Sequence, residues 1–147
     1  MTPTAFSRAE LLDARVALYG ERRVVRFQDV DAAGIVFYPR ILEMFSDAYV
    51  ATFAARGFDL PRALRKDPVV LPLAHAEADF LAPLRFGDVV DVEVVAARVG
   101  EASFRVGYRA TKDHQRAAFG QTIHVCIDRT TSSSMRVPDA IRRVLGA

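Results

Sequence analysis

Two aspartates, Asp29 and Asp31, lie in an acidic turn between a strand-like stretch and a long apolar segment with helical spacing. The turn contains Gly34 and leads into Tyr38 and Pro39, where a helix is expected to open. A carboxylate here would lie beside the unpaired N–H groups and positive dipole end of that helix, which polarise a carbonyl oxygen. Hydrolysis of an acyl group requires at least a base or nucleophile and a hydrogen-bond donor to the carbonyl oxygen. The alternative is that both aspartates only satisfy backbone groups of the turn.

The composition is that of an ordinary globular protein, with 51% hydrophobic and 26% charged residues in 147. This length fits one domain. The net charge is only +2, and no basic run is interleaved with aromatic residues, so nucleic-acid binding is not expected. The single cysteine, Cys126, excludes an intrachain disulfide and lies in an apolar run, where a buried, inert thiol is expected. With no signal-peptide pattern and no apolar run near the ~20 residues of a membrane helix, a cytoplasmic enzyme or binding domain is expected.

The spacing of apolar residues predicts one long helix after the acidic turn. Leu42, Phe45, Tyr49 and Phe53 recur at helical intervals, and Gly57 would end the helix. Further apolar residues widen this surface, so the helix should be enclosed on more than one side. A sheet wrapped around the helix would provide that enclosure.

Alternation with a period of two predicts four strands after the helix. One strand before it is predicted by Val24, Val25 and Phe27, which lie among arginines. The expected strands span residues 22–27, 71–80, 89–99, 102–112 and 116–128. Short connections indicate that the later strands meander antiparallel, and short helices are expected near residues 8–14, 59–66 and 138–145. The prediction is an N-terminal extension, residues 1–21, and a single α+β domain, residues 22–147. Such a sheet would leave an edge available for pairing between subunits.

The segment from Asp31 to Pro39, Asp-Ala-Ala-Gly-Ile-Val-Phe-Tyr-Pro, closely resembles the turn of the 4-hydroxybenzoyl-CoA thioesterase family. Residues 79–88, and residues 125–128 followed by Val137 and Pro138, are similar to later segments of that family. The resemblance implies a hot-dog fold, a five-stranded antiparallel sheet wrapped around a long central helix. It also implies an enzyme that hydrolyses an acyl-CoA thioester to a free acid and coenzyme A. Such proteins are homodimers or dimers of dimers with active sites shared between two chains.

The resemblance assigns roles to individual residues. Asp31 stands where the family has its catalytic carboxylate, acting as nucleophile or as general base toward water. Tyr38 stands where a backbone N–H polarises the thioester carbonyl. Gly34 would let the chain approach the substrate closely, and Phe37 would line the acyl pocket. His75 would contact the substrate from the partner subunit.

Coenzyme A carries phosphates, which basic residues should bind. Arg85, Arg98 and Arg129 lie near strand ends where the family binds the nucleotide. The turn at residues 99–101 departs from the aryl-CoA thioesterases, which place arginines or lysines there. Coenzyme A is part of the substrate, so no separate cofactor is expected.

Other titratable residues have less specific interpretations. Asp29 is expected to support the turn that holds the catalytic carboxylate. Glu43 is the fallback catalytic residue, although its place in a polar stripe of the helix favours an ion-pair role. His75, Glu77 and Asp79 alternate along one strand, where successive members of the face lie ~7 Å apart, too spread for one metal ion.

The strongest alternative is a hot-dog protein that binds acyl-CoA or acyl-carrier protein without hydrolysis, or a dehydratase-like relative. Hydratase relatives usually pair an Asp with a His on the helix side. No His occurs between Met1 and Val70, which favours hydrolysis. Both aryl and short aliphatic acyl groups are compatible with the sequence, and the similarity of the turn to aryl-CoA enzymes favours an aryl group.

Overall fold

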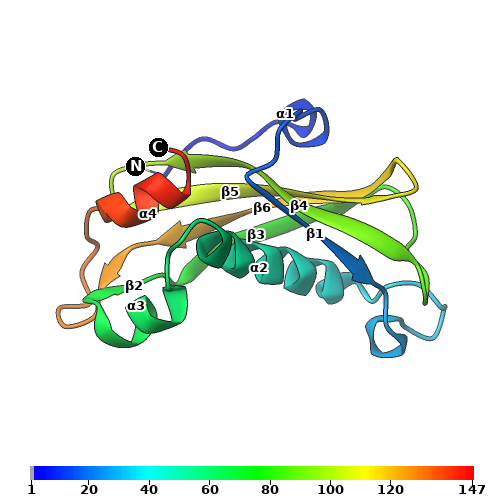
Figure 1. Ribbon diagram of the computed structural model, residues 1–147, viewed down its shortest axis with the longest axis horizontal. Coiled ribbons are helices and arrows are strands. Elements are labelled where there is room, and N and C mark those ends of the chain that lie inside the picture. The colour runs from blue at the N-terminus through cyan, green and yellow to red at the C-terminus, as the bar shows by residue number, and fades with distance from the viewer. Residues whose placement is uncertain (1) are drawn as a thin grey trace.

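Helix α2 (Tyr38–Ala55) lies across one face of a five-stranded antiparallel sheet in the computed structural model, which describes residues 2–147 (Figure 1). The sheet consists of β1 (Tyr19–Val24), β3 (Leu73–Phe80), β4 (Val89–Val99), β5 (Ser103–Lys112) and β6 (Gln115–Val125). The smaller elements are α1 (Arg8–Leu12), α3 (Leu60–Lys66), α4 (Asp139–Val144), the short strands β2 (Val69–Val70) and β7 (Ile127–Asp128), and a 3₁₀ turn (Phe27–Asp29). The predicted α+β hot-dog architecture is confirmed.

The strand order in the sheet is β1-β4-β5-β6-β3. Strands β4, β5 and β6 meander as predicted, because strands joined by short turns pair as antiparallel neighbours. Strand β3 does not pair with β4, which follows it along the chain, but lies at the opposite edge beside β6. Residues 81–88 therefore cross from one edge of the sheet toward the other. On the way they pass the start of α2, where the Val36 N–H donates to the Leu84 carbonyl at 2.8 Å.

Strand β1 differs from its predicted range, residues 22–27. It begins at Tyr19, within the stretch predicted as an extension, and pairs with β4 over its whole length up to Val24. The chain then leaves the sheet because Asp29, in the 3₁₀ turn, accepts the backbone N–H of Arg26 at 2.8 Å. The polar contact of one side chain thus ends the strand before Phe27, although the apolar residues Val24, Val25 and Phe27 predict that it continues.

The last predicted strand, residues 116–128, is divided in two. β6 ends at Val125 and β7 begins at Ile127, while the N–H of Cys126 between them still donates to the Ala102 carbonyl at 2.8 Å, in register with the preceding Ser103–Val125 pair. β7 then pairs with β2 outside the main sheet. Burial raises the pKa of the Cys126 thiol to about 11, which keeps it protonated and unreactive at neutral pH.

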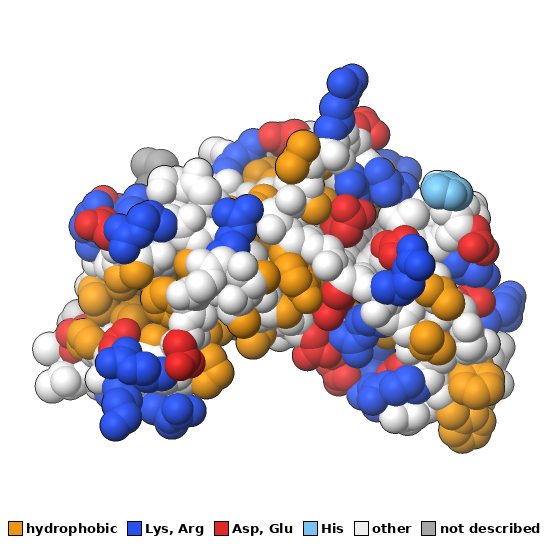
Figure 2. Space-filling view, viewed as in Figure 1, with side chains coloured by type: hydrophobic (Ala, Val, Ile, Leu, Met, Phe, Trp, Pro, Cys, Tyr) orange, Lys and Arg blue, Asp and Glu red, His pale blue; other side chains and the backbone are white. Residues whose placement is uncertain are grey.

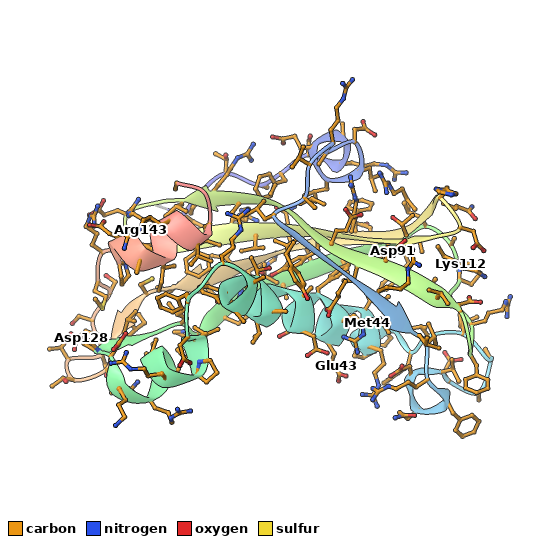
Figure 3. The ribbon with its side chains drawn as sticks, in the orientation of Figure 1. Glu43, Met44, Asp91, Lys112, Asp128 and Arg143 are labelled. Atoms are coloured by element: carbon orange, nitrogen blue, oxygen red, sulfur yellow. The ribbon has the colours of Figure 1, made fainter. Side chains whose placement is uncertain are left out.

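One face of α2 is buried against the sheet. The buried residues recur every three or four positions and are Ile41, Met44, Phe45, Ala48, Tyr49, Thr52 and Phe53. The Phe45 ring stacks on Tyr108 of β5 with centroids 5.0 Å apart, whereas Glu43 points away from the sheet (Figure 3). The helix ends before Gly57, whose φ of +79° is typical of a helix C-terminus. Within residues 2–147, no helix is both long and apolar enough to cross a membrane.

The N-terminal segment, residues 2–18, covers the face of the sheet opposite α2 (Figure 1). Phe6 and Leu11 are buried there against Phe119 of β6. Gly107 of β5 makes room for them, since a Cβ at this position would collide with the Leu11 side chain. The predicted short helix near residue 8 is thus part of the N-terminal segment that packs against this face of the sheet.

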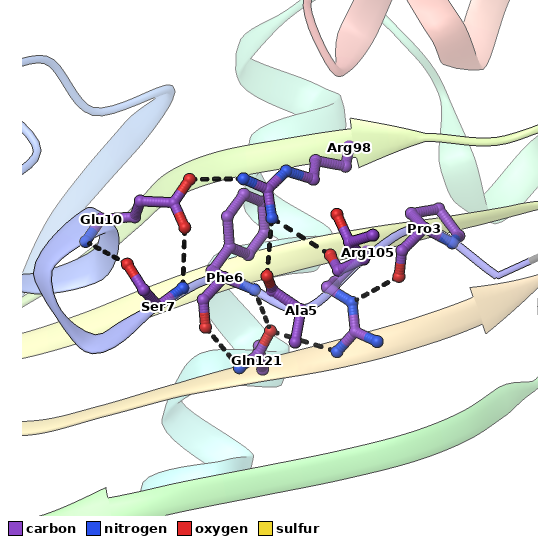
Figure 4. A network of polar contacts seen from close by, with 9 residues as sticks. Pro3, Ala5, Phe6, Ser7, Glu10, Arg98, Arg105 and Gln121 are labelled. Atoms are coloured by element: carbon purple, nitrogen blue, oxygen red, sulfur yellow. Dashed lines mark hydrogen bonds and ion pairs between the residues drawn. The ribbon is translucent and has the colours of Figure 1, made fainter.

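Side chains of the sheet hold the backbone of the N-terminal segment (Figure 4). The Gln121 amide accepts the Phe6 N–H at 2.9 Å and donates to the Phe6 carbonyl at 3.2 Å. Arg105 donates to the Pro3 carbonyl at 3.0 Å. Arg105 and Arg109, on the polar face of the predicted strand, are therefore only 8% and 5% exposed.

A chain of polar groups is buried in the core beneath α2. The Tyr108 hydroxyl lies 2.7 Å from Thr122 Oγ1, which lies 3.1 Å from His124 Nε2. The His124 ring stacks on Tyr49 with centroids 4.2 Å apart. Burial lowers the pKa of His124 to about 4, although a hydrogen bond to the Leu71 backbone opposes the shift. The imidazole is therefore neutral in the folded protein at physiological pH.

We expect acid to destabilise the fold through His124. Its pKa is about 4 in the folded chain and near 6.5 in the unfolded chain, so its stabilising contribution is present above pH 6.5 and lost as pH falls toward 4. Between about pH 7.5 and about pH 5, the free energy of unfolding should fall by about 2 kcal/mol through this residue. Urea unfolding of the wild type and of His124→Gln at both pH values measures this difference. The variant should lack this part of the pH dependence. Equal pH dependence of the unfolding free energy in both proteins would contradict the assignment of this loss to His124.

Candidate active site

The acidic turn folds as a small hairpin between β1 and α2. The Phe37 N–H donates to the Asp29 carbonyl at 2.8 Å, and the Asp31 N–H donates to the Ile35 carbonyl at 2.9 Å. The Gly34 N–H closes the tip by donating to the Asp31 carbonyl at 2.9 Å. Gly34 has a φ of +80°, a conformation that strains any residue with a Cβ. The hairpin thereby returns the chain from Asp31 to the first turn of α2.

The Asp31 carboxylate is partly engaged by its own turn. Oδ1 accepts the Ala33 N–H at 2.8 Å, whereas Oδ2 accepts no hydrogen bond from the described residues. One oxygen therefore orients the side chain, as a turn-stabilising Asp would. The other oxygen is available to a ligand.

Asp29 is buried and supports the hairpin. Its carboxylate is 2% exposed, accepts Arg26 Nη2 at 3.1 Å, and lies 3.9 Å from Arg40 of α2. Burial would raise the pKa of Asp29, but the hydrogen bonds and charge of Arg26 outweigh burial and lower this pKa. The charged carboxylate therefore ties the base of the hairpin to the first turn of α2, in agreement with the supporting role expected for it.

The N-terminus of α2 presents an unpaired N–H. Phe37 is the N-cap and makes no side-chain capping bond, and Pro39 has no N–H to offer. The Arg40 N–H donates back to the Phe37 carbonyl at 2.8 Å. The Tyr38 N–H has no acceptor among residues 2–147. It is an orphan donor at the positive end of the helix dipole.

An apolar pocket of about 390 Å³ opens between the hairpin, the start of α2 and the sheet. Asp31 and Tyr38 both line it. The rest of its wall is apolar and includes Phe80 at the end of β3, Leu84 in the crossing connection and Ala118 of β6. A carboxylate and a helix N-terminus in one otherwise apolar cavity is an arrangement suited to acyl transfer.

Hydrophobic side chains are also exposed at the end of the molecule that carries the hairpin (Figure 2). The rings of Phe27 and Phe86, 77% and 62% exposed, meet edge to face with centroids 5.9 Å apart. Arg85 precedes Phe86, and its N–H donates to the Asp88 carboxylate at 2.7 Å. The Arg85 guanidinium forms no ion pair within the described chain, and the Asp88 carboxylate pairs with Lys112 at 3.0 Å.

Phe37 and His75 do not line the pocket of their own subunit. The Phe37 ring is half exposed and contacts the Tyr38 ring, with centroids 5.2 Å apart. His75 lies on the edge strand β3, with Nε2 3.0 Å from the Glu77 carboxylate. Hydrogen bonds from His75 and Gln121 lower the pKa of Glu77, although burial opposes them.

The structure separates the three candidate arginines. Arg98 donates to two carbonyls of the N-terminal segment and pairs with Glu10 (Figure 4). Arg129 donates to two carbonyls around the end of α3. Its neighbour Asp128 lies at the opposite end of the molecule from Lys112, which pairs with Asp88 close to Arg85 (Figure 3). Only Arg85 adjoins the pocket, since it follows Leu84 in the chain.

Glu43 lies in a different groove from Asp31. Its side chain is 59% exposed and pairs with Arg40 at 2.7 Å, as expected from the helical spacing. The groove also contains Arg23 and Asp47, which pair at 2.6 Å. Glu43, the alternative catalytic residue, therefore lies outside the apolar pocket, and its charge is balanced by Arg40.

The apolar wall of the pocket was not predicted from the sequence. Phe80 and Leu84 lie in the segment similar to the thioesterase family, but no role was expected of them. Ala117 and Ala118 could have indicated this wall, because consecutive apolar residues break the period of two expected for a regular strand.

The family model of the thioesterase-like superfamily matches residues 25–145. The chain belongs to the thioesterase-like superfamily. The matched range includes the hairpin and α2, whereas the N-terminal segment lies outside it. The predicted family, hot-dog fold and enzyme class, a thioester hydrolase of the acyl-CoA thioesterase kind, are confirmed.

Several relatives of this thioesterase are similar over most of their length. The 1,4-dihydroxy-2-naphthoyl-CoA hydrolase of Synechococcus elongatus is 39% identical over 129 residues, 86% of this chain and 94% of that protein. The hydrolase of the same description from Nostoc punctiforme is 34% identical over 119 residues, 81% of this chain and 80% of that protein. The crystal structure of a 1,4-dihydroxy-2-naphthoyl-CoA thioesterase from Synechocystis superposes with a TM-score of 0.82, at 27% identity over 87% of this chain and 95% of that chain. A gentisyl-coenzyme A thioesterase superposes with a TM-score of 0.75, at 26% identity over 87% of this chain and 99% of that chain.

Proposed function

We propose that this thioesterase hydrolyses an aryl-CoA thioester to an aromatic acid and coenzyme A. The observation that carries the proposal is that Asp31 and Tyr38 line one apolar pocket of about 390 Å³. An apolar wall with a few polar groups at one side suits an aromatic acyl group whose carbonyl faces those polar groups. The similarity to hydrolases of 1,4-dihydroxy-2-naphthoyl-CoA makes that thioester the first substrate to test.

In the proposed reaction, the Tyr38 N–H donates to the thioester carbonyl oxygen and stabilises the negative charge that develops there. As a nucleophile, Asp31 forms a mixed anhydride while the C–S bond breaks and coenzyme A leaves as the thiolate. Water then cleaves the anhydride and restores the carboxylate. As a general base, Asp31 instead takes a proton from the water that attacks the carbonyl carbon. The C–S bond of the tetrahedral intermediate then breaks, and coenzyme A leaves as the thiolate, which takes up the proton held by Asp31. Because a thiolate is a good leaving group, neither route calls for a metal ion.

The proposed enzyme is a homodimer or a dimer of dimers with shared sites. The exposed edge strand β3 supports this proposal, because unpaired backbone groups at a sheet edge favour pairing with a second chain. In that assembly His75 would contact the substrate in the partner's site. Gly34 and Phe37 do not line the pocket within one subunit, and in the assembly they would lie at its rim, near the acyl group. Arg85 is the proposed phosphate-binding residue, since Arg98 and Arg129 would have to exchange backbone carbonyls for phosphate.

A thiol-release assay over a panel of aryl and short aliphatic acyl-CoA thioesters tests the proposed function. We expect kcat/KM for 1,4-dihydroxy-2-naphthoyl-CoA and other aryl-CoA thioesters to exceed that for acetyl-CoA and butyryl-CoA by about tenfold or more, because the apolar pocket gains from burying a ring. A preference for the aliphatic thioesters would contradict an aryl substrate. Binding of acyl-CoA by calorimetry without thiol release from any thioester would favour the non-hydrolytic alternative.

A further inference from the structure

Strand β6 carries a β-bulge at the wall of the pocket. Ala118 pairs with Ala110 of β5, but the next pair joins Thr111 to Arg116, so Ala117 is an extra residue without a partner on β5. A bulge of this kind bends its strand and redirects the neighbouring side chains. Both adjacent alanines consequently line the pocket, although neighbours in a regular strand point to opposite faces.

The bulge also fixes the opposite wall of the pocket. The Ala117 carbonyl accepts the Leu81 N–H at 2.8 Å and the Ala82 N–H at 3.2 Å. Two hydrogen bonds thus tie the start of the crossing connection, which carries Leu84, to β6. These two walls are therefore held together by backbone hydrogen bonds in which the side chain at position 118 takes no part.

The space for a ligand ends a short way beyond Ala118. Gly120 lies two residues further along the same face of β6, and a Cβ there would collide with the Glu77 carbonyl and lie 3.0 Å from the Phe45 ring. Ile41, which also lines the pocket, is 2% exposed and packed in the core. Because packed interiors yield little, a larger side chain at position 118 would have to extend into the pocket.

We infer that Ala118 determines the depth of the acyl pocket and allows it to hold a fused bicyclic aromatic acyl group. This inference rests on the proposed function and deepens it by naming the residue that selects ring size. Asp31 and Tyr38 line the pocket as exposed residues, whereas Ala118 is 1% exposed, so an isopropyl group added to the Ala118 methyl fills the buried end of the pocket. It excludes the second ring of a naphthoyl group and leaves the first ring and the carbonyl in place.

The variants Ala118→Val and Ala118→Leu test this inference with 2-naphthoyl-CoA and benzoyl-CoA as substrates. We expect kcat/KM for 2-naphthoyl-CoA to fall by roughly 30-fold or more in Ala118→Leu, whereas kcat/KM for benzoyl-CoA changes less than about threefold. The effect in Ala118→Val should be intermediate. Ala55→Leu, on the exposed side of α2, is the matched control and should leave both values unchanged.

Calorimetric binding of the free acids 2-naphthoate and benzoate separates this inference from the proposed function. A wild type that releases no thiol from any thioester overturns the proposed function, while the two binding constants still report the depth of the pocket. Loss of 2-naphthoate binding with retained benzoate binding in Ala118→Leu supports the inference. Equal losses for both acids, or none, overturn it. If Ala118→Leu does not fold, the same comparison in Ala118→Val decides.

Discussion

Asp31→Asn is expected to lower kcat for thiol release by about a thousandfold or more, because a loss of this size is usual when a general base or a nucleophile is removed. The amide keeps an oxygen for the Ala33 N–H, so the hairpin should retain its geometry. It removes the negative charge and the nucleophilic oxygen that would face the thioester. Thiol-release assays with the preferred aryl-CoA thioester measure kcat, and calorimetry measures the affinity of the variant for the product acid.

Glu43→Gln is the matched control for this prediction. Glu43 is a carboxylate on the first turns of α2, but it pairs with Arg40 in a separate groove. Its substitution should change kcat by less than about threefold, because only an exposed ion pair is lost. Wild-type turnover in Asp31→Asn would exclude Asp31 from the chemistry. A large loss in Glu43→Gln with little effect of Asp31→Asn would assign the chemistry to the helix carboxylate.

Tyr38→Pro is expected to lower kcat by about 100-fold to 1,000-fold, the usual cost of removing one oxyanion donor. Proline lacks the N–H that would bind the thioester oxygen, yet it is tolerated at the first position of a helix. The backbone can accept it, because the preceding Phe37 is already extended, with φ of −61° and ψ of 126°. The change therefore removes one hydrogen-bond donor and leaves the start of α2 in place.

Tyr38→Ala provides the comparison for this second prediction, since it removes the same ring but keeps the N–H. We expect its kcat to stay within about fivefold of the wild type, and circular dichroism should show equal helix content in both variants. Equal losses in Tyr38→Pro and Tyr38→Ala would mean that the ring, not the backbone N–H, carries the contribution of Tyr38.

Local sequence determines the elements that position the site. Gly34 is required where the hairpin has a positive φ, and Pro39 is compatible with the opening of α2. The recurrence of Phe45, Tyr49 and Phe53 identifies the buried face of the helix, because helical spacing places these residues on one side. Each of these features depends on residues that are close together in the chain, so its physical cause can be inferred from the sequence.

Other features depend on contacts between distant residues. The position of β3 at the far edge, beside β6, cannot be deduced from connection lengths, because the long connection after Phe80 permits several pairings. The burial of Arg105 and Arg109 depends on the N-terminal segment, which covers a strand face that alternation alone marks as exposed. The engagement of Arg98 by that same segment has the same cause.

The acidic turn by itself determined where a carboxylate and a helix N-terminus meet, because Asp31 and Tyr38 are joined by one short hairpin. The tertiary structure alone decided what surrounds them. It brought the crossing connection and the bulge at Ala117 to the same place, and so formed the apolar pocket. The reason is physical: hairpins and helix starts depend on local backbone preferences, whereas a pocket depends on the packing of segments that lie far apart in the chain.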